Sequence, residues 1–440
     1  MTNRSYQSWA GYPVVEHEAR KMNWQTDSLP LEGSDGKSFL PYGNGRSYGD
    51  VCLNDGGIVV DCRGLNHFIE FDSENGILRC EAGVTLQEIL HFTVPKGWFL
   101  SVTPGTQFVT VGGAIANDVH GKNHHKAGTF GQHVNCFELL RSDGSRRLCS
   151  AEENAEWYQA TIGGLGLTGV IIWAEIRLRP VKSALIDQEV IRYSNLAEFF
   201  EIAKASDQDY EHTVAWIDCL AQGDQLGRGL FIRGNYSDTV QNRAVRQPKL
   251  NLTVPLEPPF TLINSMTLKM FNTVYYNKQR KDQIKSQVHY KPFFYPLDAI
   301  YQWNRIYGSK GFFQYQCALP VEHMEDAMGE ILQRISKAGL GSFLTVLKLF
   351  GDKPSPGLLS FPMPGATLAL DFPNYGQKTL DLLNQLDEVT RSVGGRVNPS
   401  KDARMSSEDF QHHFSNWRKM EDYIDPRISS SFWRRVTAES

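Results

Sequence analysis

PYGNGRSYGD, at residues 41–50, is the first of four glycine-rich stretches that together decide the fold of this chain. Its glycines allow successive backbone N–H groups to converge, and Arg46 and Ser47 can add side-chain donors. Such a loop forms an anion-binding nest, and a pyrophosphate is a common occupant. A sharp surface turn uses the same residue types, so this stretch taken alone fits both interpretations.

Two further glycine-rich stretches constrain the cofactor. Residues 103–116 (TPGTQFVTVGGAIA) place small residues where a flat ring or a phosphate could approach the backbone, although tight strand–turn–helix packing explains them equally well. Residues 163–169 (GGLGLTG) contain a literal GxGxxG, with a helix expected before it at 154–161 and a strand after it at 170–178. A nicotinamide-binding fingerprint requires strand, glycines and then helix. This order therefore argues against a nicotinamide-dependent Rossmann enzyme.

The remaining stretch, residues 120–131 (HGKNHHKAGTFG), holds three histidines within six residues. Imidazole is a common metal ligand. However, His124 and His125 are adjacent and would diverge on regular structure, and no acidic or thiolate partner stands at ligand spacing. We expect a polar site loop and no metal.

Composition limits the classes of function. The chain has 440 residues, with 45 Lys and Arg against 49 Asp and Glu, which gives a formal net charge of -4. A nucleic-acid partner is excluded, because it would demand a basic excess concentrated on one face. With 41% hydrophobic and 21% charged residues the chain is folded rather than disordered, and its length suggests about two or three domains.

The spacing of the cysteines and the absence of long apolar runs indicate the cellular compartment of the protein. Seven cysteines are scattered without a CxxC pair, which is typical of reduced thiols. The first residues lack the basic and apolar regions of a signal peptide, and no run of about 18 apolar residues is present. We expect a cytoplasmic protein, with a peripheral contact to the inner membrane as an open alternative.

Periodicity predicts the elements outside the glycine-rich stretches. Alternation predicts strands at 57–62, 68–71, 77–80, 213–219, 229–232, 343–350 and 366–372. Thr85 and Glu88 have capping-box spacing and predict a short helix to about His91, and apolar spacing predicts another helix over 322–338. Residues 255–313 are rich in aromatics, Lys and Pro without a clean period. We expect them to form a long excursion outside the core: a mobile segment that approaches a membrane surface or, as the alternative, an ordered lid over the pocket.

Four blocks in sequence order resemble the vanillyl-alcohol-oxidase-type (PCMH-type) family of FAD-dependent oxidoreductases: residues 43–50 (GNGRSYGD), 104–125 (PGTQFVTVGGAIANDVHGKNHH), 163–169 and 394–404 (GGRVNPSKDAR). The resemblance covers nearly the whole chain. It implies an α+β fold of two domains, in which a split FAD-binding domain surrounds an antiparallel-sheet substrate domain. The implied boundaries are 1–180 and 396–440 for the FAD-binding domain and 181–395 for the substrate domain.

The resemblance also assigns the cofactor and its contacts. The implied FAD-binding residues are Pro41, Gly43, Asn44, Gly45, Arg46, Ser47, Tyr48, Gly49, Gly105, Thr110, Gly112, Gly113, Asn117, His120, Val170 and Asn398. Many relatives carry the flavin covalently on a histidine, and the equivalent position in this chain is Arg46. Because arginine cannot make that bond, we expect noncovalent FAD.

Further blocks, such as FLTVLKLFG at 343–351 and LSFPMPG at 359–365, are similar to a branch of the family that oxidises a ribose. This implies oxidation of the 2′-hydroxyl of a polyprenyl-phospho-ribofuranose to the 2-keto sugar, the first half of a ribose-to-arabinose epimerisation in arabinose biosynthesis for the cell envelope. An NAD(P)H-dependent short-chain keto-reductase would act next. The implied substrate-binding residues are Gln314, Gln316, Lys348, Thr367 and Asp371, and the implied catalytic residues are Lys401, His120, Tyr48 and Lys122.

The chemistry requires a group that takes or stabilises the hydroxyl proton as the C–H bond breaks. Lys401 suits this role if burial lowers its pKa, and His120 is the second candidate base. The sequence leaves the choice between them open.

Two other functions fit the same blocks. An alditol or aldonolactone oxidase acting on a small soluble polyol has the same fold, but such relatives usually attach FAD through the histidine that Arg46 replaces. A flavin-binding protein without turnover is the other alternative, and the presence of Lys122 and Lys401 argues against it.

The chain also has Ala369 where the ribose-oxidising branch has cysteine, and Asn398 where it has an aromatic residue. We expect these departures to change the shape of the pocket.

Overall fold

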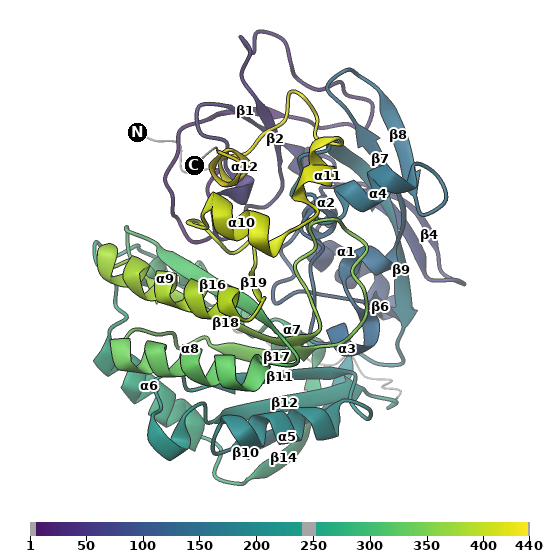
Figure 1. The fold of residues 1–440 in the computed structure, drawn as a ribbon. Helices are drawn as coiled ribbons and strands as arrows, with labels where there is room; N and C mark the ends of the chain where they lie inside the picture. Colours follow the sequence, from purple (N-terminus) through teal and green to yellow (C-terminus); the bar gives the residue numbers. More distant parts are fainter. Residues whose placement is uncertain (1–5, 240–251, 439–440) are drawn as a thin grey trace.

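Two large antiparallel sheets and a small parallel one organise the chain, of which the computed structural model describes residues 6–239 and 252–438 (Figure 1). The parallel sheet has the order β1 (Glu18–Lys21), β3 (Ile58–Asp61), β2 (Phe39–Tyr42). The six-stranded sheet consists of β4 (Phe68–Asp72), β5 (Ile77–Glu81), β9 (Val170–Pro180), β7 (Val134–Leu140) and β8 (Arg146–Ser150), with β6 (Trp98–Leu100) also paired to β9. The eight-stranded sheet has the order β14 (Gln283–His289), β10 (Leu185–Tyr193), β12 (Gly229–Tyr236), β11 (His212–Ile217), β17 (Val346–Phe350), β18 (Gly365–Pro373), β16 (Phe312–Pro320), β19 (Arg396–Val397).

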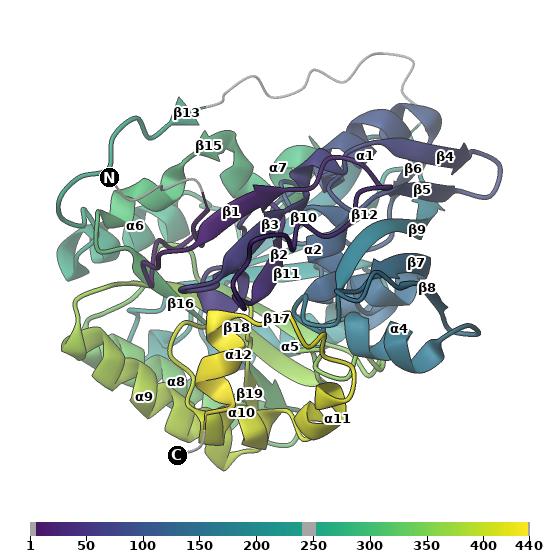
Figure 2. The ribbon, with the colours of Figure 1, turned by 90° about the horizontal axis from the view of Figure 1, so that it is seen from above.

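The α-helices lie between and around these sheets, so the chain has the mixed helix and sheet content expected of an α+β protein (Figures 1 and 2). In chain order they are α1 (Leu86–Thr93), α2 (Val111–Ala116), α3 (His124–Ala127), α4 (Ala155–Thr161), α5 (Leu196–Ser206), α6 (Ser265–Asn277), α7 (Tyr290–Phe294), α8 (Met324–Ala338), α9 (Gln377–Ser392), α10 (Ser407–His413), α11 (Trp417–Glu421) and α12 (Ser431–Val436). Within the described ranges, no helix combines the length and apolar character that crossing a membrane requires.

Local sequence signals predicted several elements correctly. The capping box that starts α1 is present, because the Thr85 hydroxyl accepts from the Glu88 backbone N–H while the Glu88 carboxylate accepts from the Thr85 N–H. The helix expected at 322–338 is α8, whose buried side chains recur every three or four residues and so share one face. Helix α4 precedes the glycines of 163–169 and strand β9 follows them, which confirms the order that argued against a Rossmann fingerprint.

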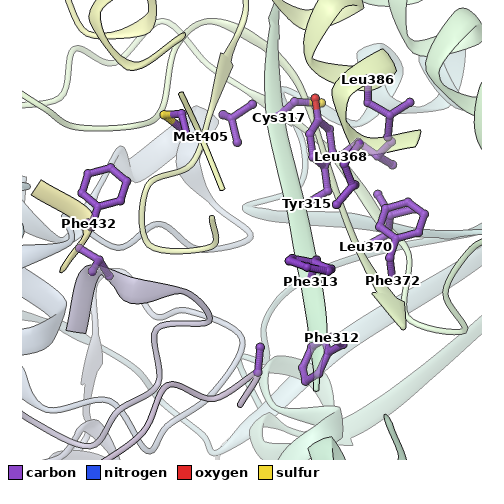
Figure 3. Close-up of a cluster of buried hydrophobic side chains, with 14 of the residues drawn as sticks. Phe312, Phe313, Tyr315, Cys317, Leu368, Leu370, Phe372, Leu386, Met405 and Phe432 are labelled. Atoms are coloured by element: carbon purple, nitrogen blue, oxygen red, sulfur yellow. The ribbon is translucent and has the colours of Figure 1, made fainter. Parts of the chain in front are cut away.

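The centre of the eight-stranded sheet has one apolar face and one polar face. Alternate residues of β16 and β18 pack with α8 and α9 in the main core: Tyr315, Cys317, Leu368, Leu370 and Phe372 are all buried (Figure 3). The residues between them, such as Gln316 and Asp371, point to the opposite face, because side chains alternate along a strand. This face carries the polar side chains discussed below.

The C-terminal segment returns to the N-terminal part of the chain (Figure 2). The backbone N–H of Phe39 donates to the carbonyl of Arg427, and the Ser429 N–H donates to the carbonyl of Phe39. Arg435, on α12, forms an ion pair with Asp50 at 2.7 Å. Before that return, β19 pairs with β16 and so connects this segment to the edge of the large sheet.

The expectation that residues 255–313 form an excursion without regular structure is wrong. The segment contains α6, β14, α7 and the short strand β15 (Ile300–Tyr301), which pairs with β13 (Leu252–Thr253). Strand β14 is an edge strand of the eight-stranded sheet, paired with β10 from Leu185↔His289 to Ile191↔Gln283. Most of its side chains are exposed on both faces, so the sequence shows no apolar alternation there. This is why periodicity missed it.

Candidate functional site

A cavity of about 440 Å³ lies where the glycine-rich loops meet the polar face of the large sheet. Its volume is in the range of small-molecule and cofactor sites. All predicted site residues except Gly49 line it, together with residues 294–303 of the segment that was expected to be an excursion. Gly49 instead lies against backbone, because a Cβ there would overlap the carbonyl of Asp402. The sequence thus located the cavity, whereas the individual roles of its residues stay predictions.

The first glycine-rich loop is packed tightly against the second. A Cβ on Gly43 would lie 2.5 Å from the Thr110 hydroxyl, so only glycine fits there. The Asn44 side chain donates to the carbonyl of Phe108 at 2.9 Å, and Gly45 has a left-handed φ of +56°. These contacts hold the backbone of residues 43–45 along one wall of the cavity.

Arg46 lies on the same wall as a buried cation. Its guanidinium carbon is 4.3 Å from the Trp9 ring centroid, and burial lowers its pKa. The Nε atom of Arg46 has no hydrogen-bond partner among the described residues, and neither does Oδ1 of Asn117. Buried polar atoms are normally paired. A donor and an acceptor are therefore available to a ligand in this cavity.

The histidines of residues 120–131 point in different directions, as expected from their spacing. His124 Nδ1 accepts from the Gly351 N–H, whereas His125 Nε2 lies 3.0 Å from the carbonyl of Tyr210. Across residues 6–239 and 252–438, no three His, Cys, Asp or Glu side chains gather as a metal site would require.

His120 is the member of this loop that lines the cavity. Its Nδ1 lies 2.8 Å from Nζ of Lys348, and its Nε2 lies 3.2 Å from Nε2 of Gln316. Burial holds its pKa well below the usual value. The ring is therefore neutral, with both nitrogens engaged by neighbouring side chains.

Three lysines face the same cavity. Burial lowers the pKa of Lys401 to about 8, against the opposing attraction of Asp371, and burial alone lowers the pKa of Lys122 to about 8. Lys348 is only 8% exposed, and its pKa is lowered well below the usual value by burial and by the charges of the other two lysines. Such shifts are typical of amines that exchange protons near neutral pH.

Tyr48 and Asp371 complete the surroundings of Lys401. The Lys401 Nζ lies 4.1 Å from the centroid of the Tyr48 ring, and burial raises the pKa of the Tyr48 hydroxyl. Asp371 accepts from the Gln314 side chain at 2.8 Å, and burial raises its pKa to about 7. Lys401 therefore lies beside an aromatic ring and near a carboxyl group that titrates in the same pH range.

Residues that sequence reasoning missed come mainly from 294–303 and from the N-terminal segment. Asp298 accepts from the backbone N–H of Gln107 at 2.9 Å and lies near Arg46, while Trp9 covers the guanidinium. Tyr301 and Trp303 also line the cavity. The aromatic content of 255–313 was the available signal, but it did not indicate which residues face inward.

Comparison with known proteins gives this geometry a chemical context. The family model described as an FAD binding domain matches residues 32–150. Decaprenylphosphoryl-beta-D-ribose oxidase of Mycolicibacterium smegmatis is 36% identical over 403 residues, which cover 89% of this chain and 87% of that protein. D-arabinono-1,4-lactone oxidase of Eremothecium gossypii is 25% identical over 274 residues, which cover 59% of this chain and 51% of that protein.

The cavity fits the cofactor that these matches imply. The glycines of residues 43–45 allow a ligand to lie against the backbone, and Arg46 and Asn117 provide the donor and acceptor that lack partners. The matched residues 32–150 contribute most of this wall. FAD is the cofactor, and the protein is an oxidoreductase. The chain belongs to the vanillyl-alcohol-oxidase-type family of FAD-dependent oxidoreductases.

Proposed function

We propose that this enzyme oxidises the 2′-hydroxyl of a ribofuranose carried on a polyprenyl phosphate, which yields the 2-keto sugar. The observation that carries the proposal is 36% identity, over 89% of the chain, to an oxidase of a decaprenylphosphoryl ribose. The polar cavity face supports it, because Gln314 and Thr367 offer amide and hydroxyl groups that bind sugar hydroxyls.

The three domain segments expected from the sequence are part of the proposal. Residues 1–180 and 396–440 would form the FAD-binding domain, and 181–395 the substrate domain. The hydrogen bonds between Phe39 and residues 427–429 support joining the two outer segments. The strands from β10 to β18, apart from β13 and β15, which pair with each other, lie in one antiparallel sheet, which supports the middle segment.

FAD, when bound along the glycine-rich wall, would supply the acceptor for the hydride of the carbinol carbon. Lys401 takes the proton of the reacting hydroxyl: the O–H bond breaks, an N–H bond forms at Nζ, and the oxygen becomes the carbonyl. A pKa of about 8 leaves a useful fraction of neutral amine at neutral pH. His120 is not the acceptor, because both of its ring nitrogens already have partners. Tyr48, beside Lys401, and Lys122, which also lines the cavity, would position the reacting sugar.

Noncovalent attachment of FAD remains part of the proposal. Arg46 occupies the position of the histidine that carries the flavin in many relatives, and its guanidinium lies over Trp9 at 4.3 Å. Acid precipitation of the purified protein tests this point: yellow colour in the supernatant supports noncovalent FAD, and colour retained in the pellet contradicts it.

A contact with the inner membrane from the cytoplasmic side would deliver the prenyl chain. Helix α6 exposes Met266, Met270 and Val274 on one side, with exposed fractions of 80%, 67% and 66%. Exposed apolar groups on this scale are typical of interaction surfaces. Tyr301 and Val346 are partly exposed and also line the cavity, so apolar side chains of the cavity reach the surface. Flotation with vesicles of anionic lipid tests this, with Met270→Glu as the variant expected to lose binding.

The substrate itself is tested by anaerobic mixing. A prenyl-phospho-ribose should bleach the visible absorbance of the bound FAD, whereas the matching arabinose lipid should not. The similarity to an arabinonolactone oxidase supports a second candidate, oxidation of a small soluble polyol or lactone. Bleaching by such compounds, without bleaching by the ribose lipid, would favour that candidate.

Formation of a 2-keto product also implies a following NAD(P)H-dependent short-chain reductase, which should regenerate a sugar when it is added with NADPH.

A further inference from the structure

A ladder of side-chain hydrogen bonds runs across the cavity wall from the C-terminal segment to Lys348. It starts at the backbone N–H of Ser400, which donates to Oδ1 of Asn398 at 3.0 Å. Nδ2 of Asn398 then lies 2.9 Å from Oε1 of Gln316. Gln316 Nε2 lies 3.2 Å from His120 Nε2, and His120 Nδ1 lies 2.8 Å from Lys348 Nζ.

The first rung has a fixed direction, because a backbone N–H can only donate. The Asn398 atom facing Ser400 must therefore be the amide oxygen, so the other Asn398 atom is the nitrogen and donates to Gln316. The Gln316 atom that receives this bond must be its oxygen. Its nitrogen consequently faces His120, and the Thr367 hydroxyl accepts from the same nitrogen at 3.2 Å.

The direction continues through the histidine. Gln316 Nε2 is a donor, and two donors at 3.2 Å would repel, so Nε2 of His120 must accept. A neutral imidazole with an unprotonated Nε2 carries its proton on Nδ1. That N–H points to Lys348 Nζ, which must offer a lone pair. Lys348 uses one of its own N–H groups to donate to the carbonyl of Gly121 at 2.7 Å.

We infer that Ser400, acting through Asn398 and Gln316, fixes His120 as the Nδ1–H tautomer and holds Lys348 as a neutral amine. The surroundings of Lys348 agree with this state. Its side chain is 8% exposed, the cations Lys122 and Lys401 act on it across the cavity, and His124 and His125 lie nearby. Of the two carboxyl groups that line the cavity among the described residues, Asp371 interacts with Lys401, and Asp298 lies near Arg46.

These hydrogen bonds limit which group can take the hydroxyl proton of the substrate. This step of the inference rests on the proposed function. The lone pair of Lys348 is used by the His120 N–H, and both His120 nitrogens are used by neighbours. Neither group can take the hydroxyl proton without breaking the ladder. Asn398, Gln316 and His120 are thus positioning residues, and Lys401 remains the amine that accepts the proton.

The tautomer can be measured without substrate on the FAD-loaded enzyme. In protein labelled with ¹⁵N-histidine and ¹⁵N-lysine, multiple-bond correlations within each ring distinguish a protonated Nδ1 from a protonated Nε2. The His120 signal is identified by its loss in His120→Asn, and the Lys348 signal by its loss in Lys348→Met. We expect protonated Nδ1 at His120 and an amine-type ¹⁵Nζ signal for Lys348 at neutral pH. Protonated Nε2 together with an ammonium signal from Lys348 would overturn the inference, whatever the substrate proves to be.

Asn398→Asp should reverse the ladder. A carboxylate can accept from Ser400 but cannot donate to Gln316, so the Gln316 amide should turn, present its oxygen to His120 and stabilise the Nε2–H tautomer. Lys348 then donates to Nδ1 as an ammonium. Asn384→Asp, which adds the same charge at an exposed position of α9, should leave the His120 signal unchanged. A folded Asn398→Asp protein in which His120 keeps the Nδ1–H tautomer would contradict the proposed role of Asn398. If that variant does not fold, the spectrum of the unsubstituted enzyme decides.

The pH profile separates the two states of Lys348. Removing a neutral neighbour changes no charge, so Lys348→Met should leave the pH at which Lys401 titrates in the kcat/KM profile within about 0.3 unit. If Lys348 were an ammonium, its removal would raise the pKa of Lys401 and move the profile to higher pH. A purely structural role of Lys348 would change the amplitude of the kcat/KM profile but not its position on the pH axis.

Discussion

Strands β16 and β18 present an apolar face to the helices and a polar face to the cavity. On the helix side, Tyr315, Leu368 and Leu370 are buried against α8 and α9, and Tyr315 shares a hydrogen bond with Thr390 of α9. On the cavity side, Gln316 and Asp371 are equally buried, but their surroundings are other polar groups. Burial alone therefore does not distinguish the stabilising face from the functional one.

The two faces differ in the free energy of burying their side chains. An apolar side chain gains free energy when it leaves water, whereas a buried amide or amine must find a partner or change its charge. On the cavity face this requirement appears as directed hydrogen bonds and as shifted pKa values for Lys348 and Asp371. Substitutions on the two sides should consequently separate stability from activity.

The largest effect is expected on the cavity side. Lys401→Met should lower kcat by about 10²- to 10⁴-fold, because it removes the group that accepts the hydroxyl proton. FAD content and the free energy of unfolding should change little. Single-turnover rates of FAD bleaching measure the effect, and Lys419→Met at an exposed position is the matched control. An unchanged rate in Lys401→Met would assign the base to another residue.

On the helix side the effect should be on stability. Leu368→Ala, at a fully buried site, is expected to lower the free energy of unfolding by about 2–5 kcal/mol, because it leaves a cavity in the core. Denaturant titration of the FAD-loaded enzyme measures this. The same truncation at Leu256, which is 78% exposed, should cost less than about 0.5 kcal/mol. If Leu368→Ala lost activity per folded molecule instead, the separation between the faces would fail.

The pH dependence sharpens the assignment of Lys401. The neutral amine is the active form and its pKa is about 8, so kcat/KM should rise with pH and level off above that value. Below it, the fraction of neutral amine falls about tenfold per pH unit. Steady-state rates across the neutral range test this. A profile that is flat from mildly acidic to mildly alkaline pH would contradict a lysine base.

A smaller effect is expected across the cavity at the cofactor wall. Arg46→Met removes the buried guanidinium and should weaken FAD binding by about tenfold, which corresponds to about 1.4 kcal/mol. Fluorescence titration of the apoprotein with FAD measures this affinity. Arg418→Met, on α11, is the matched control and should bind FAD like the unsubstituted protein. Unchanged affinity in Arg46→Met would place the flavin away from this residue.

Much of the fold could be predicted from local sequence, and the site residues implied by the resemblance, except Gly49, line the cavity. The capping box of α1, the spacing of α8 and the helix-before-glycine order are all properties of short segments, and the structure confirms each of them. The edge strand β14 could not be predicted, because exposure on both faces removes the alternation that marks a strand. Gly49 shows the same limit at the site: its glycine is required by the backbone of Asp402, which is distant in sequence.

The sequence by itself determined the family, the cofactor and where the cavity lies, since the glycine-rich loops and the resemblance are properties of residue order. Only the tertiary structure decided how those residues are protonated and which of them have free lone pairs. Asn398, Gln316, His120 and Lys348 come from four separate segments, and their hydrogen-bond directions depend on contacts between those segments. Proton positions follow from desolvation and from partners that folding brings together, and neither property belongs to any one segment of the chain.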